Sequence, residues 1–155
     1  MRNERSRVDV RTFDELQVGE RFPLPSRTVT DAHFAAFQAI SGDNHPIHYD
    51  VEYCRSQGHR GMLAHGLQVL CYSAAGAGLF ADVVGRAMIA FIDQSSRFLQ
   101  PVHPGDTLYP TLEIAELKRQ RTTGVVVLES VIENQRGERV LEGRQRYLVR
   151  LEGDS

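Results

Sequence analysis

The spacing of the hydrophobic residues changes along the chain near Gly85. Upstream of it, Phe34, Phe37 and Ile40 recur every three residues, which predicts a helix whose apolar side they line. This helix is expected to begin at Thr30, because a threonine hydroxyl can cap the free amides of the first turn. It should end soon after Ile40, where a polar loop follows.

Two further helices are expected before the spacing changes. A short one covers Asp50 to Ser56 and ends at Gly58. The segment from His65 to Phe80 is apolar almost all the way round, which is typical of a helix buried on most sides. We therefore expect this segment to form one buried helix.

Downstream of Gly85 the hydrophobic residues alternate with a period of two, which indicates strands. The first strand, around 87–92, is apolar on both faces, and the last alternates apolar with charged residues. Long antiparallel strands with one buried helix make α+β the expected fold class. The apolar positions of the later strands are Leu108, Leu112, Ile114, Val126, Leu128, Ile132, Leu141, Tyr147, Val149 and Leu151.

Length and charge narrow the class of protein. The 155 residues suffice for one domain with a sizeable core, which we place at 13–151 after a polar tail at 1–12. The formal net charge of -2 gives no reason to expect nucleic acid or an anionic membrane as a partner. The longest apolar run, 61–84, is interrupted by polar residues and glycines, so we expect no membrane span.

The compartment is expected to be the cytoplasm. Cys54 and Cys71 lie in apparently helical segments without the spacing of a disulfide framework, so we interpret them as free, buried thiols in a reducing compartment. The segment from Met1 to Val10 alternates basic and acidic residues and lacks the apolar core of a secretory signal.

The candidate chemistry lies in the segment Ile40–Tyr49. It places Asp43, His45 and His48 between Gly42, which can take backbone angles closed to other residues, and Pro46, which restrains its neighbours. On a regular helix Asp43 and His48 would face different directions. A bent loop can turn both side chains toward one point, as an acid–base pair requires.

Several motifs follow one another in a fixed order. They are Phe37, Ile40-Ser41-Gly42-Asp43, Pro46-Ile47-His48, Asp50 and His65-Gly66, with a looser echo in Phe98-Leu99-Gln100-Pro101-Val102 and Pro104-Gly105-Asp106. Together they resemble the MaoC-like hydratases, which include (R)-specific enoyl-CoA hydratases and 3-hydroxyacyl thioester dehydratases. In one place the chain departs from that family, because His45 stands where an asparagine usually precedes the proline.

The resemblance implies a hotdog fold, in which a curled antiparallel sheet wraps around a central helix and subunits commonly pair. It also implies hydration of a trans-2-enoyl thioester to an (R)-3-hydroxyacyl thioester, with Asp43 and His48 sharing the catalytic water. The substrate would be carried on coenzyme A or an acyl carrier protein. No further cofactor and no metal is implied.

Gly66 and His65 complete the expected site. The amide of Gly66, in the first turn of a helix, has no partner within that helix and can hold the oxygen of a developing enolate. His65 can cap or orient this turn, and His45 can orient the loop or the water. Each also has a purely structural interpretation, as a tight helix entry or a half-buried imidazole.

Three alternatives remain open from the sequence. The first is a hotdog thioesterase, and the second is a subunit that binds acyl thioesters without turning them over. The third is a metal site, since His45, His48 and Asp43, with His59 and His65 nearby in sequence, form a set of nitrogen and oxygen donors that zinc or iron accepts.

Overall fold

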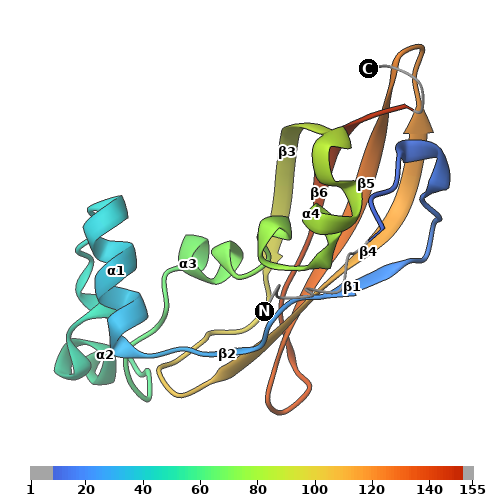
Figure 1. Cartoon of the computed structure of the whole chain (residues 1–155). Coiled ribbons are helices and arrows are strands. Elements are labelled where there is room, and N and C mark those ends of the chain that lie inside the picture. The colour runs from blue at the N-terminus through green and yellow to red at the C-terminus, as the bar shows by residue number, and fades with distance from the viewer. Residues whose placement is uncertain (1–8, 152–155) are drawn as a thin grey trace, which may run out of the picture.

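The computed structural model describes residues 9–151 and is built around a curled antiparallel sheet (Figure 1). Four long strands run side by side in the order β4, β5, β6, β3, and two short N-terminal strands, β1 and β2, pair with β4. β3 is therefore an edge strand. The strands are β1 (Arg21–Pro23), β2 (Arg27–Thr28), β3 (Met88–Phe98), β4 (Thr107–Arg119), β5 (Thr123–Asn134) and β6 (Arg139–Arg150).

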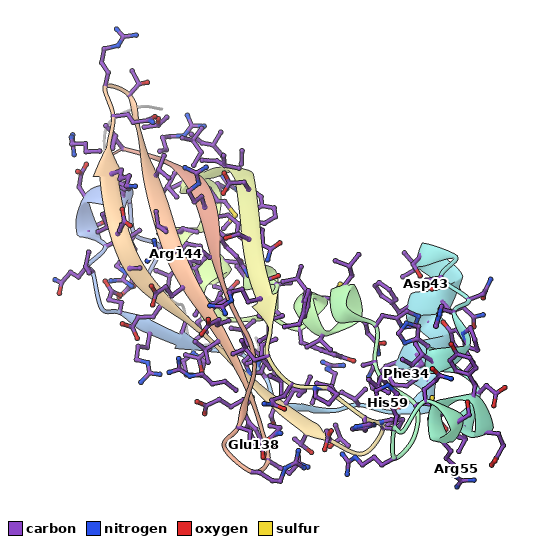
Figure 2. The ribbon with its side chains drawn as sticks, turned by 180° about the vertical axis from the view of Figure 1, so that it is seen from behind. Phe34, Asp43, Arg55, His59, Glu138 and Arg144 are labelled. Atoms are coloured by element: carbon purple, nitrogen blue, oxygen red, sulfur yellow. The ribbon has the colours of Figure 1, made fainter. Side chains whose placement is uncertain are left out.

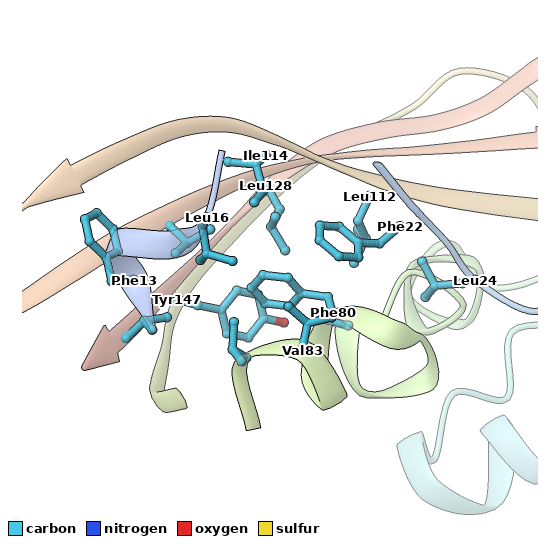
Figure 3. Packing of buried hydrophobic residues seen from close by; sticks show 14 of the residues in the cluster. Phe13, Leu16, Phe22, Leu24, Phe80, Val83, Leu112, Ile114, Leu128 and Tyr147 are labelled. Carbon is cyan, nitrogen blue, oxygen red and sulfur yellow. The ribbon is translucent and has the colours of Figure 1, made fainter. Parts of the chain in front are cut away.

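The strands occur where the alternating pattern predicts them, except that β3 continues past 92 through the polar stretch to Phe98. Leu108, Leu112 and Ile114 of β4 are fully buried, and so are Val126, Leu128 and Ile132 of β5. Leu112, Ile114, Val126 and Leu128 form one core cluster with Phe80 and Val83 of α4 (Figure 3). Leu108 and Ile132 belong to a second cluster, with Phe34 and Val69. The opposite face carries ion pairs such as Arg144 with Glu129, so only one face of the sheet holds the core.

Four helices connect β2 to β3, and the first two begin and end as the sequence predicts. Thr30 precedes α1 and bonds to His33 Nδ1, while Gly42 ends α1 with a positive φ of 71°. Asp50 caps α2 by accepting a hydrogen bond from the Tyr53 amide. The helices are α1 (Asp31–Ser41), α2 (Val51–Ser56), α3 (Gly66–Cys71) and α4 (Leu79–Val84), with a 3-10 turn, η3 (Ala75–Ala77), before α4.

The prediction of a single buried helix over 65–80 is wrong. The segment breaks after α3, passes through η3 and resumes as α4. Ser73 contributes to the break because its hydroxyl bonds back to the Leu70 carbonyl, and the amide of Gln145 on β6 bonds to the Ser73 carbonyl. Gly78 is extended, with φ of −132°, and so cannot continue a helix. α4 lies against the sheet, and α3 lies between the sheet and α1 (Figure 1).

The structure corrects two further expectations. The apolar side of α1 is buried only at Phe34, whose exposed fraction is 2%, whereas Ile40 is 85% exposed. Cys54 is buried as expected, but Cys71 is exposed, and both thiols are free.

The expected tail at 1–12 lies mostly outside the described residues. Within them, the amide of Arg11 bonds to the Val83 carbonyl, and its guanidinium pairs with Glu20, so Arg11 is attached to the domain. In the part of the chain that the structure describes, no helix is long and apolar enough to cross a membrane.

Candidate active site

The loop after α1 is held in shape by its own side chains. Asp43 Oδ1 accepts a hydrogen bond of 3.1 Å from the His45 amide. His45 Nδ1 in turn accepts one of 3.3 Å from the Ile47 amide, and thereby caps the 3-10 turn Pro46–His48. The two bonds stabilise the bend that brings His48 back toward Asp43.

Asp43 and His48 face each other at the end of this bend, with 3.9 Å between Asp43 Oδ2 and His48 Nε2. This separation is too long for a direct hydrogen bond. It is close to the span of about 4.5 Å that one water would bridge by donating a hydrogen bond to each atom. The side chain of His48 is only 13% exposed, while that of Asp43 is 49% exposed. The pair can therefore hold a water that enters from the solvent side.

The protonation of His48 follows from its other contact. Its Nδ1 lies 2.6 Å from the carbonyl oxygen of Leu63. A carbonyl can only accept, so Nδ1 carries the proton and Nε2 offers a lone pair toward Asp43.

The pKa values of the pair keep both groups ready to accept a proton near neutral pH. The hydrogen bond from the His45 amide lowers the pKa of Asp43, with a contribution from His48, although desolvation acts against them. Burial lowers the pKa of the His48 imidazole, and the nearby His65 adds to this, while the Leu63 carbonyl and the Asp43 charge oppose it. Asp43 is therefore a carboxylate and His48 a neutral imidazole.

His65 supports His48 from beneath. The two imidazole rings are stacked, with centroids 3.7 Å apart and planes inclined by 22°. His65 is 2% exposed, and its Nε2 lies 2.8 Å from the Tyr49 hydroxyl. That hydroxyl also donates to the Asp43 carbonyl oxygen at 2.7 Å, so Tyr49 ties the loop to His65. No pattern in the sequence pointed to Tyr49, because a lone tyrosine after the motif histidine has no distinctive spacing.

Gly66 follows His65 directly and is the first residue of α3. A side chain at this position would meet the ring of Phe98, because an added Cβ would lie 3.3 Å from two of its atoms. The close approach of Phe98 therefore explains on packing grounds why a glycine occupies this position. The oxyanion role of its amide stays a prediction.

The structure thus brings Asp43, His48 and His65 together. Their potential ligand atoms lie within 4.8 Å of one another, whereas His45 and His59 do not join this group. A metal would need the imidazole lone pairs to converge, but nearly parallel stacked rings direct them side by side. The geometry favours proton transfer over metal binding, and the absence of a metal stays a prediction.

The hollows on the sheet do not coincide with this cluster. One of about 550 Å³ lies among residues of β3, β5 and β6, including Arg144. Arg144 and Asp43 lie far apart in the molecule (Figure 2). A second, of about 300 Å³, is lined by Gly66 and Phe98 and so adjoins the start of α3.

Comparison with known proteins places the chain in a family. The MaoC like domain matches residues 15–135, most of the chain. The chain belongs to the MaoC-like family. Protein MaoC of Klebsiella aerogenes is 34% identical over 113 residues, or 71% of this chain, but the match spans only 33% of that longer protein. An (R)-specific enoyl-CoA hydratase of Rhodospirillum rubrum is 26% identical over 133 residues, 79% of this chain and 87% of the relative.

Solved structures confirm the hotdog fold of this MaoC-like chain. A Monoamine oxidase regulatory protein from Archaeoglobus fulgius matches with a TM-score of 0.85 and 30% identity, over 92% of this chain and 96% of that one. A Mycobacterium tuberculosis protein described as a double hotdog fold matches with a TM-score of 0.76 and 26% identity, over 94% and 46%. The α+β class and the curled sheet agree with this fold.

Proposed function

We propose that this protein reversibly hydrates a trans-2-enoyl thioester, carried on coenzyme A, to an (R)-3-hydroxyacyl thioester. The observation that supports this most directly is the Asp43–His48 pair, one water's span apart, beside the first turn of α3. Family membership and the named hydratase relative add to it. The (R) configuration rests on the resemblance alone.

In the hydration direction, the pair acts on the water that bridges it. The water gives a proton to the pair while its oxygen forms a bond to the β-carbon. The electrons of the double bond move toward the thioester, whose oxygen gains negative charge. The Gly66 amide, at the positive end of α3, holds that oxygen. The pair then returns the proton to the α-carbon, so the protein ends as it began.

The test is the loss of enoyl-thioester absorbance with crotonyl-CoA and with a longer trans-2-enoyl-CoA. Asp43→Asn and His48→Gln should each lower kcat by about 10²- to 10⁴-fold, the usual contribution of a positioned acid or base. Asp31→Asn and His59→Gln serve as matched controls outside the pair and should leave kcat within about twofold. Turnover that survives in both pair variants would contradict the assignment.

The same experiment separates the other functions. Release of free coenzyme A would identify a hotdog thioesterase. Tight binding of the thioesters without turnover would identify a binding subunit, and His45→Asn would then test whether the departure at this position abolished activity. Replacing coenzyme A with an acyl carrier protein tests the carrier. The cytoplasmic location stays a prediction.

We also propose that the protein acts as a homodimer or a larger homo-oligomer. β3 is an edge strand of 11 residues, and among residues 9–151 it pairs only with β6. Ile89, Phe91 and Ile92 of β3 are 44%, 55% and 45% exposed. An uncovered apolar edge strand readily pairs with another chain, so a second copy is the partner that this edge fits.

A further inference from the structure

A third pocket lies beside the C-terminal end of α3, on the inner face of the sheet. It has a volume of about 330 Å³ and is walled by Leu70 and Cys71, by the 73–76 segment, and by residues of β3 and β6. This volume lies at the lower end of the range for small-molecule sites.

The pocket lies at the C-terminal end of α3, and Gly66 is at the N-terminal end of the same helix. Gly66 and Leu70 are four residues apart in α3, so they lie on the same side of the helix, about 6 Å apart along its axis. A thioester whose oxygen rests on the Gly66 amide can therefore run its acyl chain along α3 into this pocket.

The floor of the pocket is polar, although the sheet face around it is apolar. Gln145 is 2% exposed, and its Nε2 donates to the carbonyl and hydroxyl oxygens of Ser73 at 2.8 and 3.1 Å. The Tyr147 hydroxyl donates to Gln145 Oε1 at 3.0 Å. These bonds fix Gln145 and leave both of its amide hydrogen-bonding ends occupied by protein groups.

Gln94 lies directly across from Gln145 in the pairing of β3 with β6, and it also lines the pocket. Its Nε2 is shielded from solvent and has no hydrogen-bond partner among residues 9–151. A buried amide without a partner loses its hydrogen bonds to water and gains none in the protein, so the site favours an occupant that supplies an acceptor. The terminal torsion of glutamine is broad, so the amide can turn a donor into the pocket.

The unpaired Gln94 donor therefore favours an occupant that carries a hydrogen-bond acceptor. The residues that line the pocket determine whether that acceptor should be charged or neutral. None of the lining side chains is charged. A carboxylate there would be buried without a counter-ion, which is costly. A neutral oxygen, such as a hydroxyl or a keto group, meets the Gln94 donor without that cost.

We propose that the preferred substrate is a medium-length enoyl thioester whose acyl chain carries a neutral oxygen, bound by Gln94. This inference rests on the proposed hydration and adds the class of acyl chain to it. Gln94 is the residue that determines the preference, because Gln145 is already occupied.

The test compares three trans-2-enoyl-CoA thioesters of about eight carbons, ending in a methyl group, a hydroxyl group and a carboxylate. The native protein should show about tenfold higher kcat/KM for the hydroxyl-ended chain than for the methyl-ended one. The carboxylate-ended chain should be the poorest. In Gln94→Leu the preference for the hydroxyl should fall to within about twofold. Gln17→Leu, at an exposed glutamine that does not line the pocket, should keep the preference.

The same comparison is made by calorimetry with the saturated thioesters, so that it does not depend on turnover. Because Gln94→Leu removes an unpaired buried amide, it should not lower the midpoint of thermal unfolding, and Gln94→Met provides a second variant. Equal or better use of the methyl-ended chain, or a preference that survives both variants, would overturn the inference. Absence of turnover together with a tenfold binding preference would sink the proposed hydration and leave the pocket assignment standing.

Discussion

His48 lies between groups that move the pKa of its imidazole in opposite directions. Burial lowers this pKa most, the Leu63 carbonyl and Asp43 raise it, and His65 lowers it. Because the reaction needs a neutral His48, kcat/KM should be constant near neutral pH. It should fall as the pH drops through a value below 6.5, the ordinary pKa of histidine.

Two substitutions should shift the pKa of His48 in opposite directions. Asp43→Asn removes a negative charge that favours the imidazolium, so the pKa of His48 should fall further. His65→Gln removes a neighbour that disfavours it, so the pKa of His48 should rise toward 6.5. NMR titration of the imidazole checks both shifts, and His33→Gln on α1 is the control. Shifts of the opposite sign would show that His48 is not governed by these charges.

The site could be predicted from the sequence only where a motif fixes several residues at once. Gly42 and Pro46 flank a bend, and the bend accounts for the approach of Asp43 to His48. Tyr49 escaped prediction because its contacts, to the Asp43 carbonyl and to His65, depend on how the loop lies on α3. The stacking of His48 on His65 could not be predicted either, because it depends on how close two separate segments lie in the folded chain.

At the scale of elements, the strands and the first two helices could be predicted, while the helix at 65–80 could not. The hydrophobic periodicity shows that this segment is apolar all round. A break in the helix, however, requires a group elsewhere in the chain that bonds to the backbone in place of the next helical turn. Gln145, about seventy positions later in the chain, supplies that partner by bonding to Ser73. The apolar face of the segment is therefore divided between α4, packed on the sheet, and the more exposed α3, where Leu67 is 62% exposed.

The start of α3 allows a sharp test of the Gly66 amide. Gly66 is the first helical residue, a position that tolerates proline, and His65 already has the extended geometry, with φ −59° and ψ 137°, that proline requires of its predecessor. Gly66→Pro should therefore remove the N–H with little loss of stability. We expect kcat to fall by about 10²- to 10³-fold, the usual cost of losing one oxyanion donor.

Gly66→Ala is the matched control, because it keeps the N–H and adds a Cβ that presses on Phe98 in the same way. Phe98 is 50% exposed and can yield, so this variant should retain most of its activity. Gly61→Ala, with no heavy atom within 4 Å of the added Cβ, controls for the substitution itself. Equal losses in the proline and alanine variants, with unfolding midpoints unchanged, would mean that space beside Phe98 matters and the amide does not.

At the scale of the whole molecule, the exposed edge strand β3 is the feature that the structure of a single chain does not explain. β3 contains no proline, and its only charged residues are Asp93, at its midpoint, and Arg97, near its end. Its first half thus lacks the charges and prolines by which proteins protect an edge strand. Sequence periodicity showed that this strand is apolar on both faces but could not show that it lies at an edge, because strand order depends on the whole chain.

Pairing of two copies along β3 should be visible in solution. Sedimentation should give about twice the 17.4 kDa mass of the chain, and the unfolding midpoint should rise with protein concentration, as for any associating protein. Ile92→Lys places a charge on the edge and should shift the mass toward one chain. Val18→Lys, at a position 61% exposed outside β3, should not. A native protein that sediments as one chain would rule out pairing. If β3 forms the contact, a lysine at position 92 would bury its charge between the two copies and weaken their association. An Ile92→Lys variant that still sediments as a dimer would therefore show that the contact lies on another surface.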